Sequence, residues 1–236
     1  MKYESVHTAK SSQAPAGIDA SAWPTDRYER RMLHVSEHPL IHSELTRLRE
    51  RSCPGPEFRQ RVRRIASLMV ASVTARLPTQ VVPCETPLEL TSGVSLQRPI
   101  VLAPILRAGI GFLDGFLDLL PDARVAHIGL ARNESTLVPE PYYFKAPAGL
   151  ENSEVIVLDP MLATGGSAIE AIRTLQDAGA HHVSLAVLVA SPEGVEAMEA
   201  ALPHVPVFAA ALDRCLNEKG YILPGLGDAG DRLFGT

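Results

Sequence analysis

The sequence is poor in cysteine and has none of the spacings that build a metal site. Its three cysteines, Cys53, Cys84 and Cys215, lie far apart, and no CxxC pair or Cys/His ligand spacing occurs. We therefore expect reduced thiols, as in a cytoplasmic protein, and no metal held by a protein-built cage.

Long apolar runs and an excess of basic residues are also missing. Charge, proline or glycine interrupts every hydrophobic stretch before it reaches membrane-spanning length, and no signal peptide is apparent. The chain has 22 Lys and Arg against 27 Asp and Glu, a net charge of -5. This balance disfavours nucleic-acid binding. We expect a cytoplasmic protein that binds neither membrane nor nucleic acid.

What is present can build one sizeable core. The 236 residues are 46% hydrophobic, which predicts one domain, residues 34–236, behind an N-terminal appendage. Residues 1–33 are mostly polar and lack periodicity, so we expect a flexible extension. Apolar spacing predicts helices over 39–51 and 57–77, separated by Pro54-Gly55-Pro56. The second helix carries four arginines that fit an anion site or, as we favour, a solvated face: Arg59, Arg61, Arg63 and Arg64.

From Arg98 onward, predicted strands alternate with predicted helices. The strands are 100–105, 124–130, 155–158, 183–190 and 205–212, and the helices are 111–120, 167–178 and 192–201. This alternation predicts an α/β fold with an open, mainly parallel sheet flanked by helices. In such sheets, ligands bind at the carboxyl ends of the strands. Residues 133–153 break the pattern, and a connection of this length predicts an extended arm or lid.

The stretch VIVLDPMLATGGS, residues 155–167, reads as a strand, a loop and the start of a helix. Backbone N-H groups and the positive end of the helix converge at Thr164 to Ser167, which suits a phosphate monoester. Asp159 is placed to accept hydrogen bonds from sugar hydroxyls in front of that phosphate. The alternative is a turn that only caps the helix. The P-loop and GxGxxG patterns are absent from the chain.

The string Asp159-Pro-Met-Leu-Ala-Thr-Gly-Gly-Ser167 resembles the 5-phosphoribosyl-1-diphosphate (PRPP) signature of type I phosphoribosyltransferases. A single acid followed by Pro160 is the form used by the uracil phosphoribosyltransferase family, since other branches carry two adjacent acids. Further strings fit the same family in the same order: PILRAG (104–109), RNEST (132–136), ASPEG (190–194) and LNEKGYILPGLGDAGD (216–231). The resemblance covers about residues 34–236.

The resemblance implies roles for individual residues on the PRPP side. Arg107 and Arg132 would face the pyrophosphate, where two guanidinium groups suit a highly charged leaving group. The ribose 5-phosphate and ribose hydroxyls would be bound by Asp159, Pro160, Met161, Leu162, Ala163, Thr164, Gly165, Gly166 and Ser167.

The resemblance also implies a C-terminal base-binding hood, residues 213–236. Ile222 and Gly227 to Ala229 would bind the uracil edge through main-chain atoms, and Asp228 would reach toward the ribose or the reacting N1. Asp228 is a candidate general base, and with Arg107 it forms the expected catalytic set. The density of Gly and Pro over Tyr221 to Asp231 predicts a tight loop without regular structure.

The implied reaction is transfer of the phosphoribosyl group from PRPP to N1 of uracil, giving UMP and diphosphate. Mg²⁺ would arrive bound to PRPP, and a homo-oligomer, dimer or tetramer, is expected. GTP activates some relatives, and the sequence does not decide whether it activates this chain. Arg214 stands where many relatives have Gln, and residues 1–30 match no pattern of the family. Three alternatives remain: another acceptor base, a pyrimidine regulator that also binds RNA, and a nucleotide sensor without activity.

Overall fold

The computed structural model describes residues 32–132 and 139–236. Its centre is a sheet in the order β1-β11-β10-β8-β4-β6-β7, with β5 beside β4 and β9 beside β10. Its strands are β1 (Leu33–Val35), β4 (Ile100–Leu106), β5 (Arg124–Val125), β6 (His127–Arg132), β7 (Pro139–Lys145), β8 (Glu154–Leu158), β9 (Met161–Leu162), β10 (His182–Ala190) and β11 (Val207–Leu212). Among these described strands the pairings are parallel except that of β6 with β7. The expected α/β class is confirmed.

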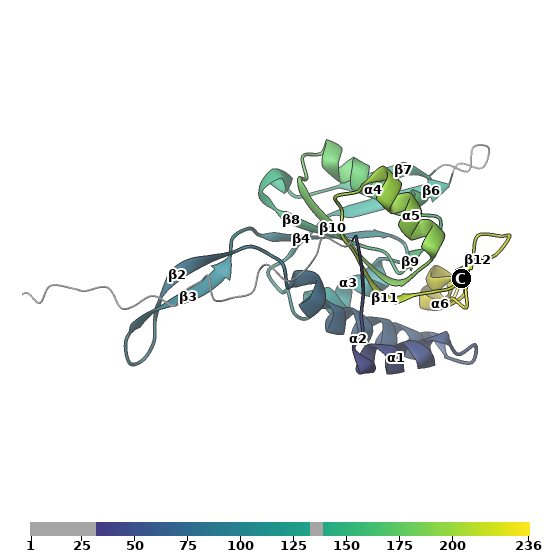
Figure 1. Ribbon diagram of the computed structural model, residues 1–236, viewed down its shortest axis with the longest axis horizontal. Helices are drawn as coiled ribbons and strands as arrows, with labels where there is room; N and C mark the ends of the chain where they lie inside the picture. Colours follow the sequence, from purple (N-terminus) through teal and green to yellow (C-terminus); the bar gives the residue numbers. More distant parts are fainter. Residues whose placement is uncertain (1–31, 133–138) are drawn as a thin grey trace, which may run out of the picture.

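The helices cover both faces of this sheet (Figure 1). On one face pack α1 (Pro39–Arg49), α2 (Gly55–Thr74) and α3 (Ile110–Leu117), and on the other pack α4 (Gly166–Asp177) and α5 (Pro192–Ala201). A short helix, α6 (Ala229–Phe234), lies near the carboxyl end of the chain. A 3-10 turn spans Leu150–Asn152.

The central strands supply side chains to two separate apolar cores. In β8, Val155 and Val157 join the core under α4 and α5, whereas Ile156 and Leu158 join the core under α1 to α3. This division follows from the strand geometry, because successive side chains point to opposite faces. It explains why β8 is buried over Val155 to Leu158 and reads as a continuous apolar run.

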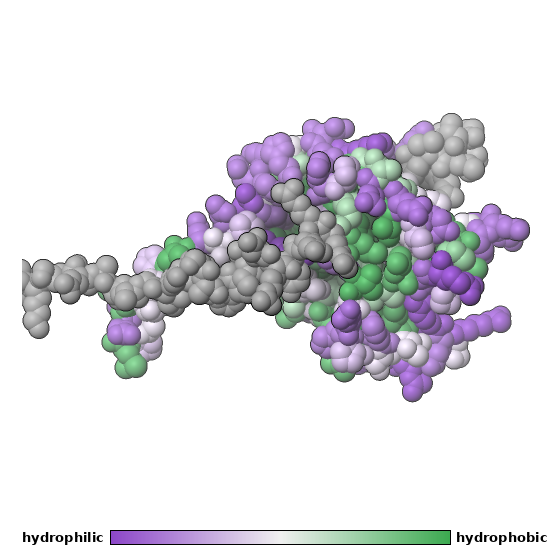
Figure 2. Space-filling view, in the orientation of Figure 1, coloured by the Kyte–Doolittle hydropathy of each residue, from purple (hydrophilic) through white to green (hydrophobic). Residues whose placement is uncertain are grey.

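A hairpin projects from the body and was not predicted (Figure 1). Strands β2 (Thr79–Glu85) and β3 (Leu90–Leu96) pair antiparallel, with Val81 opposite Val94 and Glu85 opposite Leu90. Val81, Leu90 and Val94 are each more than 60% exposed. Figure 2 shows hydrophobic side chains on this projection. Strand signals in this part of the sequence are weak, and neither strand has a buried face of the kind that a clear alternating pattern marks.

Four other predictions need correction. The predicted helix over 111–120 spans Ile110–Leu117, and the one over 57–77 begins at Gly55 with Pro56 in its first turn. The predicted strand 124–130 divides into β5 and β6. Leu33, assigned to the flexible extension, belongs to β1, which pairs with β11. Residues 1–31 lie outside the described residues.

The expected arm, 133–153, holds an edge strand. Its part from Pro139 to Lys145 is β7, which pairs antiparallel with β6, and Tyr142 packs over Gly129. Residues 133–138 lie outside the described residues. The lid or arm function assigned to this segment stays a prediction.

The arginines of α2 are engaged with acidic side chains and with the C-terminal segment. Arg61 pairs with Glu44 and Glu57 over 2.6 Å each, and its side chain is only 16% exposed. Arg63 and Arg64 are more than half exposed, as a solvated face requires.

None of the helices in the described ranges is long and apolar enough to cross a membrane.

Candidate active site

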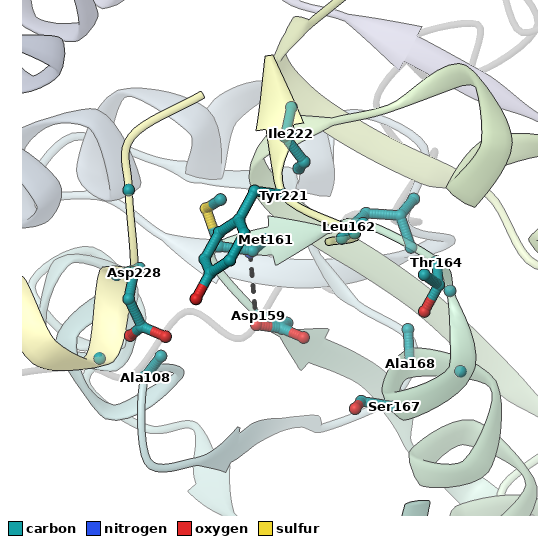
Figure 3. A pocket seen from close by; sticks show the side chains of 17 residues that line it. Ala108, Asp159, Met161, Leu162, Thr164, Ser167, Ala168, Tyr221, Ile222 and Asp228 are labelled. Atoms are coloured by element: carbon teal, nitrogen blue, oxygen red, sulfur yellow. Dashed lines mark hydrogen bonds between the residues drawn. The ribbon is translucent and has the colours of Figure 1, made fainter. Parts of the chain in front are cut away.

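An open cleft lies at the carboxyl end of β8, between the start of α4 and the C-terminal segment (Figure 3). Its volume is about 310 Å³. It brings together most residues that the sequence predicted for the two substrates. Those that line it are Asp159, Met161, Leu162, Ala163, Thr164, Gly165, Gly166 and Ser167 on one side and Ile222, Gly227, Asp228 and Ala229 on the other.

Asp159 begins the loop directly after buried β8. Its N-H donates to the Ala186 carbonyl over 3.2 Å, and its Oδ1 accepts from the Met161 N-H over 3.3 Å. Burial raises the pKa of Asp159 to about 7, and the hydrogen bond from Met161 lowers it by less. Asp159 lines the cleft, and its carboxyl group has few protein partners. A buried carboxyl group with a raised pKa at a cleft is typical of a functional site.

The loop after Asp159 turns sharply into α4. Gly165 has φ +82, a left-handed conformation that favours glycine, and α4 begins at the next residue. The first N-H groups of a helix lack partners within the helix. Here these groups and the hydroxyls of Thr164 and Ser167 border the cleft. The residues predicted to bind the phosphate therefore lie together at the start of α4, and their role stays a prediction.

The same loop is supported from behind by the start of α5. The buried Ser191 hydroxyl donates to the Ala163 carbonyl over 2.6 Å and accepts from the Gly194 N-H over 3.0 Å. A methyl group on Gly194 would lie 2.3 Å from the Ala163 carbonyl oxygen. The sequence predicted the helix that Ser191 caps, but the bond from Ser191 to the loop was missed, because the two segments meet only in the fold.

Arg107 lies outside the lining of the cleft and contacts the C-terminal segment. Its Nη1 donates to the Thr236 hydroxyl over 3.3 Å, and its Nη2 lies 3.7 Å from Asp231 Oδ1. The Arg107 side chain is 58% exposed. Gly109 follows Arg107 by two residues. A methyl group on Gly109 would lie only 2.4 Å from the Leu158 carbonyl oxygen. The absence of a side chain at Gly109 therefore lets the segment after β4 approach the end of β8 closely.

The side of the cleft that was predicted to bind the base carries regular structure that was not expected. Ile222–Leu223 forms β13, which pairs with β12 (Cys215–Leu216), and Ala229–Phe234 forms α6. The prediction of no regular structure over Tyr221 to Asp231 was wrong, because glycine density does not prevent a helix whose start is capped. Asp228 is that cap, since its Oδ1 accepts from the Asp231 N-H over 2.9 Å.

Tyr221 is a residue of the cleft that the sequence reasoning did not assign to the site. Its ring extends between Asp159 and Asp228 in Figure 3. The sequence signal was its place immediately before Ile222, in the string that resembles the family.

Pro160, which was predicted to bind PRPP, does not line the cleft. Pro160 is buried, and its carbonyl accepts from the Leu188 and Val189 N-H groups over 3.1 Å each. It thus shapes the loop from within. Arg132 is the last residue of β6, opposite Pro139. Its role at the pyrophosphate stays a prediction.

The described residues do not form a cage for a metal ion. No group of three or more His, Cys, Asp or Glu side chains gathers within them. The carboxylates that line the cleft are those of Asp159 and Asp228. These two residues fit a cation that enters with most of its ligands already supplied by a phosphorylated substrate.

Comparison with known proteins gives the same answer as the geometry. The family model described as uracil phosphoribosyltransferase matches residues 35–236. A relative of that name from Ligilactobacillus salivarius is 52% identical over 86% of this chain and 97% of its own length. Another, from Halalkalibacterium halodurans, is 52% identical over 86% of this chain and 98% of its own.

A solved structure has the same fold across nearly all of its length. The AQ2163 protein from Aquifex aeolicus aligns with a TM-score of 0.81 at 34% identity, over 87% of this chain and 99% of its own. The resemblance found in the sequence is confirmed, and the described cleft contains its signature loop. The chain belongs to the uracil phosphoribosyltransferase family.

Proposed function

We propose that this cleft is where the phosphoribosyl group of PRPP passes to N1 of uracil, giving UMP and diphosphate for pyrimidine salvage. The protein is a pentosyltransferase of the family that carries out this reaction. One observation carries the proposal: the PRPP loop and the base segment, remote in sequence, face each other across a single cavity. A sugar phosphate and a flat base could therefore be held side by side.

The start of α4 would bind the 5-phosphate. The N-H groups and hydroxyls from Thr164 to Ser167 surround the helix end, where the helix dipole favours an anion. Asp159, at the beginning of the same loop, would accept hydrogen bonds from the ribose hydroxyls. Its ionised form is the better acceptor, so sugar binding should favour loss of its proton.

Arg107 would meet the diphosphate by exchanging partners. Its present contacts with Thr236 and Asp231 are 3.3 and 3.7 Å long and exposed, and such contacts contribute little. A diphosphate offers bidentate oxygens and more charge than one carboxylate. Arg107 and Arg132 together would stabilise the negative charge that develops on the diphosphate as its bond to the anomeric carbon breaks.

Asp228 is the proposed acceptor of the uracil proton. Oδ1 of Asp228 is occupied by the Asp231 N-H. The second oxygen remains for the ribose or for N1 of uracil, directly or through water. The base attacks as diphosphate leaves, so the configuration inverts and the transition state resembles an oxocarbenium ion. Bound Mg²⁺, held mainly by PRPP oxygens, would neutralise part of the leaving-group charge.

The test of this proposal is an assay with PRPP, Mg²⁺ and each pyrimidine or purine base in turn. We expect UMP from uracil and no nucleotide from the other bases. Binding of PRPP or UMP without turnover would contradict the proposal and identify a sensor. Asp159→Ala should weaken PRPP binding, and an unchanged affinity would remove its assigned role.

The projecting hairpin supports a homo-oligomer. Val81 and Val94 are paired on one face of it, with Leu90 and Leu96 on the same face, and all four are exposed. A two-stranded hairpin with an uncovered apolar face is marginal alone, and a second copy of the chain would cover it. Sedimentation should give a dimer or larger, and Val94→Glu should dissociate it. A monomeric wild-type protein would refute this assignment.

Two further assignments rest on the resemblance and on composition. GTP is proposed as an effector, and a higher rate with GTP at subsaturating PRPP would support it, whereas unchanged kinetics would reject it. The three cysteines are free, which supports a location in the reducing cytoplasm.

A further inference from the structure

A buried ion pair lies behind the base side of the cleft. The Asp213 side chain, directly after β11, is 4% exposed, and that of Arg49, the last residue of α1, is 22% exposed. Arg49 Nη1 and Nη2 donate to the two carboxylate oxygens over 2.8 and 2.6 Å. This is the bidentate geometry of a strong, directional pair. Neither residue is among those that line the cleft.

The pair also binds both backbone groups of Gly225. The Gly225 N-H donates to Asp213 Oδ2 over 2.9 Å, and the Gly225 carbonyl accepts from Arg49 Nη1 over 2.9 Å. The Asp213 N-H in turn donates to the carbonyl of Ala190, the last residue of β10, over 2.8 Å. One residue of the base loop is thereby fixed both to the sheet and to α1.

Gly225 occupies a bend between two segments that enter the cleft. Its φ is +64, and a methyl group there would lie 2.1 Å from the Ile222 carbonyl oxygen. Ile222 precedes the bend and Gly227 follows it, and both line the cleft. A shift of Gly225 would therefore move the main chain on both sides of the base.

The ion pair suits positioning better than general stabilisation. Replacement of a buried ion pair by well-packed apolar residues is often neutral or stabilising, because both charges must lose water. The planar guanidinium group of Arg49, in contrast, binds one carboxylate and one main-chain carbonyl at once, and this fixes the orientation of the Gly225 carbonyl. We propose that Arg49 and Asp213 are positioning residues that hold the base-recognising main chain, and that they set the affinity for uracil without affecting that for PRPP.

This inference rests on the proposed assignment of uracil to Ile222 and Gly227 to Ala229. The test replaces Arg49 by lysine, which keeps the charge but cannot bridge Asp213 and the Gly225 carbonyl with a planar fork. We expect KM for uracil to rise about tenfold, as for the loss of roughly one charged hydrogen bond. KM for PRPP should change by less than about twofold, which is within the effect of a remote substitution. Asp213→Asn should act in the same direction.

Arg63→Lys is the matched control. Arg63 forms a bidentate pair with Asp118 on the helices, away from the base segment, so both KM values should stay unchanged in this variant. Chemical rescue separates positioning from a loss of stability. Guanidinium at concentrations that do not unfold the protein should lower KM for uracil in Arg49→Ala and have no effect on Arg63→Ala.

Three results would overturn the inference: an unchanged KM for uracil in Arg49→Lys, an equal rise of both KM values, or no rescue by guanidinium. Gly227→Ala tests the base site separately. Gly227 has φ +75, where a side chain is strained. If this variant leaves KM for uracil unchanged, the assignment of uracil to the loop fails. If it raises that KM and Arg49→Lys does not, only the role of the ion pair fails.

Discussion

The two sides of the cleft are built in different ways. The proposed PRPP side is one continuous stretch, Asp159 to Ser167, between a buried strand and a helix. The base side is held by side chains from the other end of the chain, since Arg49 binds Asp213 164 residues later and Arg59 binds the Leu233 carbonyl 174 residues later. A site made by local sequence can be recognised by its motif, whereas a site held from a distance needs the fold.

The largest effect should come from the support of the PRPP loop. In Gly194→Val, the new side chain would collide with the Ala163 and Leu162 carbonyls, which lie 2.3 and 2.8 Å from the position of its Cβ. We expect kcat/KM for PRPP to fall by roughly a hundredfold, the scale on which misplacement by an ångström acts. Steady-state kinetics measures this change.

Gly55→Ala is the control for that substitution. A methyl group on Gly55 meets its nearest neighbour, the Arg232 carbonyl oxygen, at an ordinary 3.5 Å, so we expect kinetics close to wild type. Normal PRPP kinetics in Gly194→Val would show that the loop does not depend on α5.

The next effect tests the distant support of the base side. Arg232 donates to the Leu226 and Glu50 carbonyls over 2.8 Å each, and its guanidinium lies 4.3 Å from the centre of the Phe58 ring. Arg232→Gln should lower the free energy of unfolding by about 2 kcal/mol, because charged hydrogen bonds and a cation-π contact are lost. Denaturant unfolding measures it. A stability equal to wild type would contradict the proposed anchoring of this segment.

A smaller effect should follow from the loss of one hydroxyl. Ser191→Ala removes the cap of α5 and the bond to the Ala163 carbonyl. We expect a loss of about 1 kcal/mol in stability and a several-fold rise in KM for PRPP, with KM for uracil unchanged. Ser191→Thr retains the hydroxyl and serves as the control. If KM for uracil rises as much as KM for PRPP, the two sides of the cleft are not separately supported.

The last effect concerns pH. Burial raises the pKa of Asp159 from its usual 3.8 to about 7, so between these values the folded protein binds this proton more strongly than the unfolded chain. The contribution of Asp159 to stability is therefore fully present below about pH 4 and is lost as pH rises through about 7. Asp159→Asn removes this dependence. Its stability relative to wild type should be greater at pH 8 than at pH 5, and equal differences at the two pH values would contradict the raised pKa.

Much of the fold from residue 98 to 212 could be predicted, because buried strands and amphipathic helices leave clear periods. Strand β8 and helix α5 match the prediction to within a residue. The β2–β3 hairpin was missed because its apolar residues face outward. Helix α6 was missed because the glycine density of this segment is typical of irregular backbone, although Asp228 caps the helix.

The site, like the fold, has one part that the sequence predicts and another that it does not. The motif from Asp159 to Ser167 predicted a loop that the structure places at the cleft, with Pro160 turned inward. The partners that hold the site, Ser191 for the loop and Arg49 for the base segment, leave no local signal. Their roles depend on which segments the fold brings together, and periodicity does not report that.

The central claim is that the entrance to α4 binds the 5-phosphate of the substrate. A crystal structure of the protein with UMP tests it most directly. We predict the phosphate within hydrogen-bond distance of the backbone N-H groups and hydroxyls of Thr164 to Ser167, with the uracil ring against Ile222 and Gly227 to Ala229. A phosphate bound elsewhere, with this helix entrance unoccupied, would contradict the account.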